Sequence, residues 1–349
     1  MYNKSIYYFR NDLRVEDNIG FINCYNNSKQ LIPIYIFEND NHKDFILNIL
    51  YHLNNKININ IYFGNPENII DKLLKEDKSI DSIFFNCQYD IYSKIRDHKI
   101  INCIKNKYNI NINILEDGLL TNIKILLNNN NKHYTKYHKF LKKIKNKVIN
   151  KPIPINVDKN KTILLKEYNY KIINNKLADR NNIINLLNNI DKKTICLSDS
   201  KLSIYLVYGI LSVRELFYML LTFIKSNNIN NYKLINELYR REFYYYISYY
   251  DNTYINTKTF DNDDNYNLWI NSKTDNDFIN KQMKRLNNNI ILDNKTKIKL
   301  ISYLVYNLNI KWELGDLYFS KKLLDYDIIL NTALCQYVNK YYINPIYNY

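Results

Sequence analysis

Three short polar side chains near the C-terminal end of the chain have the spacing of a binding pocket. Asp325 and Asp327 lie two residues apart, and Asn331 follows Asp327 by one helical turn. Residues three or four apart share one face of a helix, so the three side chains are expected to converge where a helix begins. Two carboxylates and an amide are more polar than an ordinary core requires, which indicates a cofactor pocket.

Two further groups of side chains recur at positions i, i+3 and i+4, so each group lies on one helical face. The groups are Glu237, Arg240 and Arg241, and Asn294, Lys297 and Ile298. Such a face can bind a ligand. For the first group, the alternative is an ordinary intrahelical ion pair between Glu237 and Arg241 on the surface, and spacing alone leaves both interpretations open.

Cysteine and histidine usage argues against metal or disulfide chemistry. The five cysteines include no C-x-x-C pair and the five histidines no H-x-x-x-H pair, so neither a metal site nor a disulfide framework is expected. The longest largely apolar run, from Leu202 to Val213, is too short to span a bilayer, and no basic-then-apolar leader begins the chain. We expect a soluble, reduced, cytoplasmic protein without membrane contact.

Short runs rich in Ile and Tyr alternate with helix-length segments in the first third of the chain. The runs are Ser5–Tyr8, Leu31–Phe37, Ile57–Phe63, Ser82–Asn86 and Ile110–Leu115. Apolar strands separated by helices predict an α/β domain with a doubly wound parallel sheet. No G-x-G-x-x-G follows the first run, so an ordinary dinucleotide site there is unsupported.

From about residue 195 the apolar residues recur at intervals of three and four, which predicts an all-helical second half. Leu202, Tyr205 and Leu206 begin one expected helix, and Tyr303 to Leu308 lie in another. We expect an α/β domain over residues 1–125, a basic linker over 126–194 and a helical domain over 195–349.

The net charge of +15 is concentrated in the middle of the chain. Residues 131–200 carry 16 basic and 5 acidic residues, a net charge of +11. Lysines of this segment could contact DNA phosphates. A solvated linker is the plainer interpretation for most of them.

Two long stretches carry a resemblance to a known family. Trp312 to Asn331 reads W-E-x-G-x-x-Y-F-x-x-x-L-x-D-x-D-x-x-x-N, and Phe9 to Asn18 reads F-R-N-D-L-R-V-E-D-N. Both resemble segments of the DNA photolyase and cryptochrome family, and Glu116 to Leu120, Asp199 to Ser203 and Glu237 to Phe243 fall in the family's order. The resemblance implies a Rossmann-like antenna domain followed by a helical domain that binds FAD and the DNA lesion.

The resemblance also implies which residues hold the flavin. The segment before the first helix of the second half would bind the pyrophosphate, with an ordinary helix N-cap as the alternative. Lys297 would pair with Asp325, and Asn331 would face the flavin N5. The implied cofactor residues are Asp199, Ser200, Lys201, Leu202, Ser203, Glu237, Arg241, Asn294, Lys297, Asp325, Tyr326, Asp327 and Asn331.

A second implied set contacts the substrate. Glu237 matches the family glutamate that hydrogen-bonds the damaged pyrimidines. Arg240 and Tyr337 stand where the family has aromatic side chains that flank the lesion. Relatives that repair (6-4) photoproducts carry histidines at the positions of Asn294 and Ile298, so the sequence favours cyclobutane dimers. The implied substrate residues are Glu237, Arg240, Asn294, Lys295, Ile298 and Tyr337.

Electron supply and light harvesting depart from the family pattern. Of the family's three tryptophans that reduce the flavin, Trp312 is present, whereas Cys335 and Phe260 occupy the other two positions. After the fourth strand, both folate-contacting residues are replaced in the stretch from Tyr89 to Ser93. The resemblance allows a folate (methenyltetrahydrofolate) antenna, but the two replacements argue against it.

The resemblance as a whole predicts a deoxyribodipyrimidine photo-lyase that acts on UV-damaged DNA as a monomer, without an obligate protein partner. In this reaction reduced FAD passes an electron to a flipped-out cyclobutane dimer. Two alternatives stay open. One is a cryptochrome-like blue-light flavoprotein without repair activity, and the other is a decayed photolyase that folds without flavin.

Overall fold

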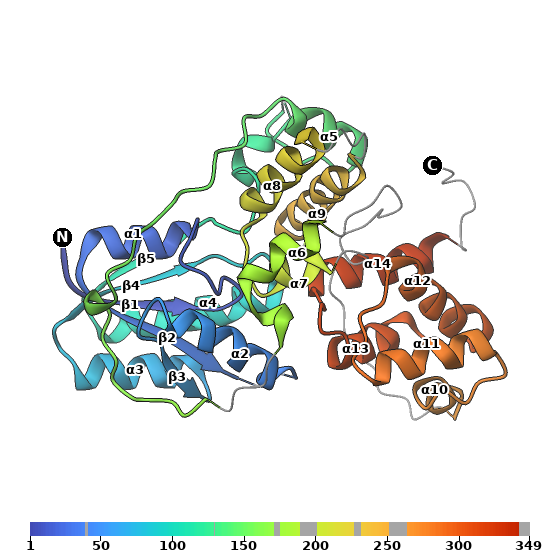
Figure 1. Ribbon diagram of the computed structural model, residues 1–349, viewed down its shortest axis with the longest axis horizontal. Helices are drawn as coiled ribbons and strands as arrows, with labels where there is room; N and C mark the ends of the chain where they lie inside the picture. Colours follow the sequence, from blue (N-terminus) through green and yellow to red (C-terminus); the bar gives the residue numbers. More distant parts are fainter. Residues whose placement is uncertain are drawn as a thin grey trace.

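The structure is a computed structural model, and it describes residues 1–38, 41–128, 130–170, 175–188, 201–226, 232–250 and 264–341. The N-terminal part is built on a parallel sheet, and helices form the rest of the molecule (Figure 1). No helix of these described residues is long and apolar enough to cross a membrane.

Five parallel strands form the sheet, in the order β3-β2-β1-β4-β5. They are β1 Tyr2–Phe9, β2 Ser28–Phe37, β3 Asn60–Phe63, β4 Ile80–Asn86 and β5 Asn111–Leu115. The expected doubly wound sheet is thus confirmed. Strand β3 is shorter than predicted, since Ile57 and Ile59 are buried but precede it.

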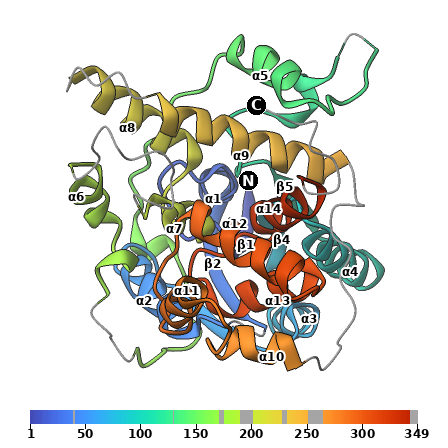
Figure 2. The ribbon, with the colours of Figure 1, turned by 90° about the vertical axis from the view of Figure 1, so that its right-hand side faces the viewer.

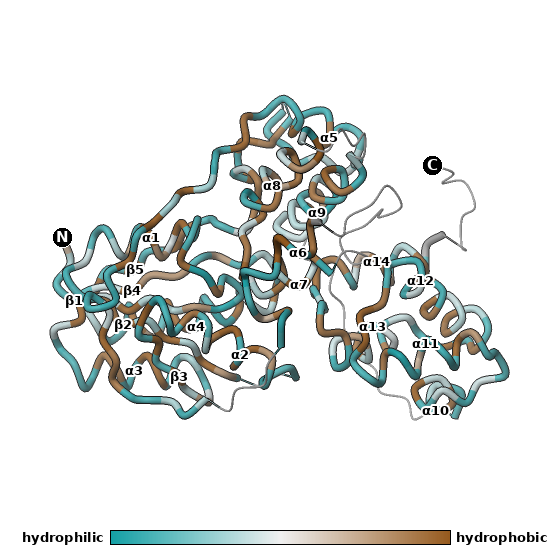
Figure 3. Tube along the Cα trace, in the orientation of Figure 1, coloured by the Kyte–Doolittle hydropathy of each residue, from teal (hydrophilic) through white to brown (hydrophobic). Residues whose placement is uncertain are grey.

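Both faces of the sheet are buried, which explains the apolar runs. The helices around it are α1 Ile19–Asn27, α2 Lys43–Asn54, α3 Pro66–Glu76 and α4 Ile91–Lys107. Ile6 and Tyr8 of β1 pack in one cluster with α3 and α4, whereas Tyr7 and Phe9 pack in another with α1 and α2. Side chains alternate between faces along a strand, so β1 anchors both layers. Figure 3 shows the hydrophobic segments of the sheet in brown.

Ten further α-helices belong to the described part of the structure. They are α5 Tyr137–Lys145, α6 Ile183–Asn188, α7 Leu202–Val207, α8 Val213–Ser226, α9 Lys233–Tyr250, α10 Asp264–Ile270, α11 Asp277–Asn287, α12 Asn294–Ser302, α13 Trp312–Lys322 and α14 Ile328–Tyr341. Helices α5, α8 and α14 each pack on α9, and α12 and α13 pack on α14. Figure 2 shows α9 running across the face of the molecule, with α12, α13 and α14 beneath it.

Two details differ from the helical pattern predicted from the sequence. The expected helix at Tyr303 to Leu308 is a π-helical turn, Tyr303–Asn307, that follows directly on α12. Apolar residues spaced three and four apart predict an α-helix and do not distinguish it from a π-helical turn, which has more residues per turn. Helix α5 lies inside the segment expected as a linker, and its Phe140 and Ile144 are fully buried.

A buried charge network joins the α/β half to the helical half. Arg214 of α8 donates to the Asp17 carboxylate at 3.0 Å and to the Asp117 carboxylate at 2.9 Å. Arg14 also pairs with Asp117 and donates to the Gly209 carbonyl at 3.1 Å. Gly209 has a φ of +64°, and a Cβ there would clash with the backbone oxygen of Asn11, so the two halves meet at backbone contact.

Candidate functional site

A cavity of about 580 Å³ opens between α9 and the α12 and α14 pair. Helix α7 closes one end of the cavity with Ser203, and the segment before α14 contributes Asp325 and Asp327. A volume of this size is within the range of about 300–1,000 Å³ that small-molecule and cofactor sites occupy. The cavity therefore collects side chains from five helices, α5, α7, α9, α12 and α14.

One wall of the cavity is a buried ion pair. The Lys297 ammonium lies 3.1 and 3.3 Å from the two carboxylate oxygens of Asp325, and the two side chains are 3% and 2% exposed. The Ser203 hydroxyl donates to Asp325 at 2.9 Å. The pairing of Lys297 with Asp325 was expected from the resemblance, and the contact is present.

The start of α14 holds the other two polar side chains. One Asp327 oxygen accepts the backbone N–H groups of Ile329 and Leu330, both at 3.0 Å, so Asp327 caps the helix. Asn331 follows one turn later and is buried, and its Nδ2 has no hydrogen-bond partner among the described residues. A buried amide that lacks a partner on a cavity wall is available to a ligand.

All six side chains expected to contact substrate line the same cavity. They are Glu237, Arg240, Asn294, Lys295, Ile298 and Tyr337. Glu237 lies 3.8 Å from Arg240, whose side chain is 55% exposed and whose guanidinium carbon is 5.8 Å from the centre of the Tyr137 ring.

The alternative of a surface ion pair between Glu237 and Arg241 is wrong. Arg241 is buried, lies 3.6 Å from Glu242 and donates to the Gly118 carbonyl at 2.9 Å. Burial, only partly offset by Arg241, raises the pKa of Glu242 to about 7. The helix presents Glu237 and Arg240 to the cavity mouth and buries Arg241 deeper in its wall.

Some residues expected to bind the cofactor do not line this cavity, and others lie outside the described residues. Lys201 is exposed just before α7 with a left-handed φ of +61°, and Leu202 is fully buried in the core. Tyr326 lines a second cavity instead, and its hydroxyl donates to Asp316 at 3.2 Å. Asp199, Ser200 and Phe260 lie outside the described residues.

The two described residues expected to carry electrons are both buried. Trp312 and Cys335 pack in the apolar cluster formed by α10 to α14. Burial, with the nearby Asp316 carboxylate, raises the pKa of the Cys335 thiol well above its ordinary value. Cys335 is therefore held as a neutral thiol at neutral pH.

Sequence reasoning missed several residues of the cavity. Tyr137 comes from α5, and Phe243 and Tyr244 come from the same helix as Glu237. The predicted sites depend on the spacing of charged and amide side chains, which these aromatic residues do not have, and Tyr137 lies in a segment expected as a linker. The i, i+3 and i+4 repeat that identified Glu237 also reaches Tyr244, at i+7, which was a usable signal.

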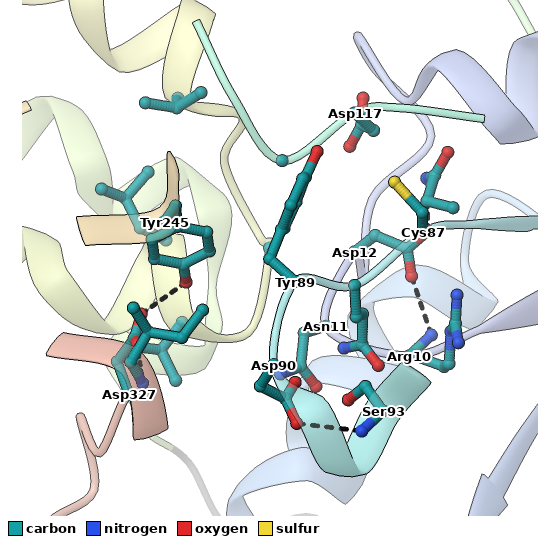
Figure 4. Close-up of a pocket in the computed structure, with 18 of the residues that line it drawn as sticks. Arg10, Asn11, Asp12, Cys87, Tyr89, Asp90, Ser93, Asp117, Tyr245 and Asp327 are labelled. Atoms are coloured by element: carbon teal, nitrogen blue, oxygen red, sulfur yellow. Dashed lines mark hydrogen bonds between the residues drawn. The ribbon is translucent and has the colours of Figure 1, made fainter. Parts of the chain in front are cut away.

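A second cavity of about 310 Å³ lies at the carboxyl ends of β1 and β4, facing α9 and the start of α14 (Figure 4). It is at the position where the strand order reverses, which is the usual ligand site of open α/β sheets. Arg10, Arg14 and Arg96 line it, and each has one buried guanidinium nitrogen with no hydrogen-bond partner among the described residues. Leu206, Val207, Arg241 and Asp327 line both cavities.

Comparison with known families fits this geometry. Residues 5–157 match the family described as DNA photolyase, and residues 234–348 match the FAD binding domain of DNA photolyase. The chain belongs to the photolyase and cryptochrome family. Its helical half is the family's FAD-binding domain, and the cofactor of that domain is FAD.

Individual relatives fall in both branches of the family. The chain is 29% identical to the deoxyribodipyrimidine photo-lyase of Buchnera aphidicola subsp. Baizongia pistaciae, over 96% of this chain and 81% of that protein. The archaeal photolyase of Sulfolobus tokodaii has the same fold, with a TM-score of 0.79, 21% identity, and coverage of 99% and 85% of the two chains. A Synechocystis cryptochrome matches with a TM-score of 0.75, 19% identity, and coverage of 97% and 82%.

The residues of the larger cavity fit a flavin. The unpartnered Asn331 amide, the buried Lys297–Asp325 pair and the Ser203 hydroxyl offer a donor, a cation and a carboxylate on one wall. Since both branches of the family share the fold, this fit assigns the cofactor but not the reaction.

Proposed function

We propose that this protein is a light-dependent lyase that splits cyclobutane pyrimidine dimers in DNA. The observation that carries the proposal is that one cavity gathers eight of the thirteen residues implied for the cofactor and all six implied for the lesion. A dimer flipped out of the duplex would then meet the flavin in a single pocket. When bound, the light-excited reduced flavin supplies an electron to the dimer and recovers it after the ring has split.

The side chains of the chain have separate tasks in this proposal. Asp325 and Asp327 hold the flavin and its ribityl group, Asn331 faces the flavin N5, and Lys297 favours negative charge on the ring. Asp199, Ser200, Lys201 and Ser203 hold the pyrophosphate. Glu237 and Asn294 donate to or accept from the dimer and stabilise the charge that develops on it.

The preference for cyclobutane dimers over (6-4) photoproducts rests on two side chains that line the same cavity as Glu237. Asn294 and Ile298 line the cavity where relatives specific for (6-4) photoproducts carry histidines. No histidine is among the described residues that line this cavity, so the imidazole of those relatives has no counterpart here. The missing histidines therefore favour cyclobutane dimers as the proposed substrate.

The proposed partner is UV-damaged DNA, bound by a monomer in the cytoplasm without an obligate protein partner. Residues 118–157 contain nine lysines and no acidic residue, and α5, within this stretch, contributes Tyr137 to the cavity wall. Exposed lysines beside the cavity would meet DNA phosphates. The proposed division remains an α/β domain over residues 1–125, a basic segment over 126–194 and a helical domain over 195–349.

The decisive experiment illuminates purified protein, with its flavin chemically reduced, beside a UV-irradiated thymine oligonucleotide. Recovery of thymine absorbance only in the light is the expected result. Glu237→Gln should slow recovery by at least ten-fold while the bound flavin per protein stays the same. The proposal fails if reduced, flavin-loaded protein shows no recovery in the light.

A cryptochrome-like signalling role is the second candidate. The observation in its favour is Arg240, a largely exposed cation at a position where the family places an aromatic side chain against the lesion. A signalling protein has no reason to prefer damaged DNA, so equal affinity for dimer-containing and undamaged duplexes would favour this role. Protein that retains no flavin at all would instead favour a decayed photolyase.

We further propose that any antenna chromophore of this protein binds in the second cavity and carries negative charge. Each of Arg10, Arg14 and Arg96 already pairs with a carboxylate, but one nitrogen of each has no partner among the described residues, and guanidinium nitrogens favour phosphate or carboxylate partners. The Sulfolobus tokodaii photolyase was described with two FAD molecules. Extraction of denatured protein should release either a second anionic chromophore or two FAD molecules per protein, and a neutral second chromophore would contradict this proposal.

A further inference from the structure

One tyrosine of α9 reaches the carboxylate that the two cavities share. The Tyr245 hydroxyl donates to Oδ2 of Asp327 at 2.6 Å, and Asp327 lines both cavities (Figure 4). The other Asp327 oxygen is occupied by the first backbone N–H groups of α14. The carboxylate is therefore fixed in place, with one oxygen directed to the phenol.

The surroundings of Tyr245 keep it a neutral phenol. Burial raises its pKa well above the ordinary value, and Asp327 adds to this rise although Arg241 opposes it. The Arg241 guanidinium carbon lies 4.0 Å from the centre of the Tyr245 ring. A phenol that loses an electron becomes a strong acid and must release its proton, so a donor tyrosine needs a base within hydrogen-bond reach. Asp327 is such a base.

A series of tyrosine rings continues from Tyr245 toward the protein surface. Its ring centre lies 5.6 Å from that of Tyr89, which lies 6.4 Å from that of Tyr249. Tyr249 lies 5.0 Å from Tyr250. Tyr89 is buried, whereas Tyr249 and Tyr250 are partly exposed. The rings connect the shared carboxylate to a position that a small reductant can approach.

We propose that Tyr245 is the electron donor that reduces bound oxidised flavin in the light, with Asp327 as its proton acceptor. This inference rests on the proposed flavin site. It explains how the chain can obtain reduced cofactor although Cys335 stands at the flavin-proximal position of the electron route, where the family has a tryptophan.

The proposed step balances in electrons and protons. Each round of the step moves one electron, so two rounds give the fully reduced flavin, which takes up its proton from water. In each round Tyr245 gives one electron to the light-excited flavin, and its hydroxyl proton passes to Oδ2 of Asp327, which leaves a neutral tyrosyl radical. An external thiol then returns one electron to Tyr245 along the ring series, and Asp327 returns the proton. Each round oxidises one thiol by one electron and releases its proton to water, and the two thiyl radicals from two rounds combine as a disulfide.

Tyr326 is the competing donor. Its hydroxyl also donates to a buried carboxylate, that of Asp316, at 3.2 Å. Asp316 lines neither cavity, and the described residues show no ring pair that leads from Tyr326 toward the surface. The geometry therefore favours Tyr245.

The test compares flavin-loaded wild type with Tyr245→Phe, Tyr326→Phe and Tyr246→Phe. Tyr246 is the matched control, because it is a buried tyrosine of the same helix whose hydroxyl donates to a carbonyl, that of Leu126, at 2.9 Å. Samples with a thiol and without oxygen are illuminated with blue light, and the loss of oxidised-flavin absorbance is measured per bound flavin. Tyr245→Phe should slow this loss at least ten-fold and Tyr246→Phe less than two-fold.

A second readout looks for the radical itself. Wild type frozen under illumination without thiol should give the electron paramagnetic resonance signal of a tyrosyl radical, and Tyr245→Phe should not. The inference is overturned if Tyr245→Phe reduces its flavin at the wild-type rate, or if Tyr326→Phe is the slow variant.

The outcomes also separate this inference from the proposed function. Wild type that retains no flavin overturns both. Tyr245-dependent photoreduction in a protein that fails to repair dimers, even with chemically reduced flavin, supports the inference and overturns the repair proposal. Repair by chemically reduced wild type without any photoreduction overturns the inference alone.

Discussion

Replacing Lys297 with methionine should strongly destabilise the flavin-free protein, because the change leaves the Asp325 carboxylate buried without a cation. The two side chains are 3% and 2% exposed, with the ammonium 3.1 Å from the nearer oxygen. Breaking one half of a buried ion pair costs about 3–5 kcal/mol. The Ser203 hydroxyl still donates to Asp325, so we expect the lower end of that range, about 3 kcal/mol.

The double variant Lys297→Met/Asp325→Leu should recover most of this loss, since apolar replacement of a whole buried pair is often neutral or stabilising. The assay is urea unfolding of flavin-free wild type, the two single variants and the double variant. Lys72→Met is the control, because Lys72 and Glu76 form an exposed pair worth about 0–1 kcal/mol. If Lys297→Met costs no more than Lys72→Met, the pair is open to water and the description of the cavity wall is wrong.

Three other parts of the molecule can be tested in the same way. Burial raises the pKa of Asp316 from 3.8 to about 6, so between these pH values the folded state binds a proton that the unfolded state has released. The free energy of unfolding should therefore fall as pH rises from about 4 to 6. Asp316→Asn should remove this fall, and an unchanged pH profile in the variant would contradict the prediction. Gly209→Ala should lower the unfolding midpoint sharply, because its Cβ would clash with the Asn11 backbone oxygen, and a near-neutral effect would refute the close approach. Lys142→Gln on α5 should make the slope of log affinity for DNA against log salt less negative by about 0.9, whereas Lys29→Gln should not.

Much of the α/β half could be predicted from the sequence because its signal is local. The three central strands β2, β1 and β4 are apolar runs that are mostly buried on both faces. Ile57 and Ile59 show where such a signal fails: both are fully buried, yet they precede β3. Burial alone does not distinguish a strand from the segment that leads into it.

The larger cavity was predictable to the extent that its residues repeat with the helical period. Glu237 and Arg240 were found in this way, as were Asn294 and Lys297. The contact of Tyr245 with Asp327 was not, because the two residues are 82 positions apart and a tyrosine in a tyrosine-rich helix carries no distinctive pattern. Helix α5 was missed for a different reason: its lysines dominate the composition, although Phe140 and Ile144 have the spacing of a buried helical face.

The α/β half is structurally necessary to the flavin site whether or not an antenna binds. Arg214 and Arg241 are buried in the helical half, but their acceptors include Asp17, Asp117 and Gly118 of the other half. If the two guanidinium groups stayed buried without those acceptors, Arg214 would lose both carboxylate partners and Arg241 would keep only Glu242, at a cost of several kcal/mol. Arg241 also covers the ring of Tyr245, which holds Asp327 at the cavity wall. The N-terminal half therefore has a structural task even if no folate binds near Tyr89, since it supplies the acceptor for the arginine that covers Tyr245, and Tyr245 holds Asp327, a proposed flavin contact.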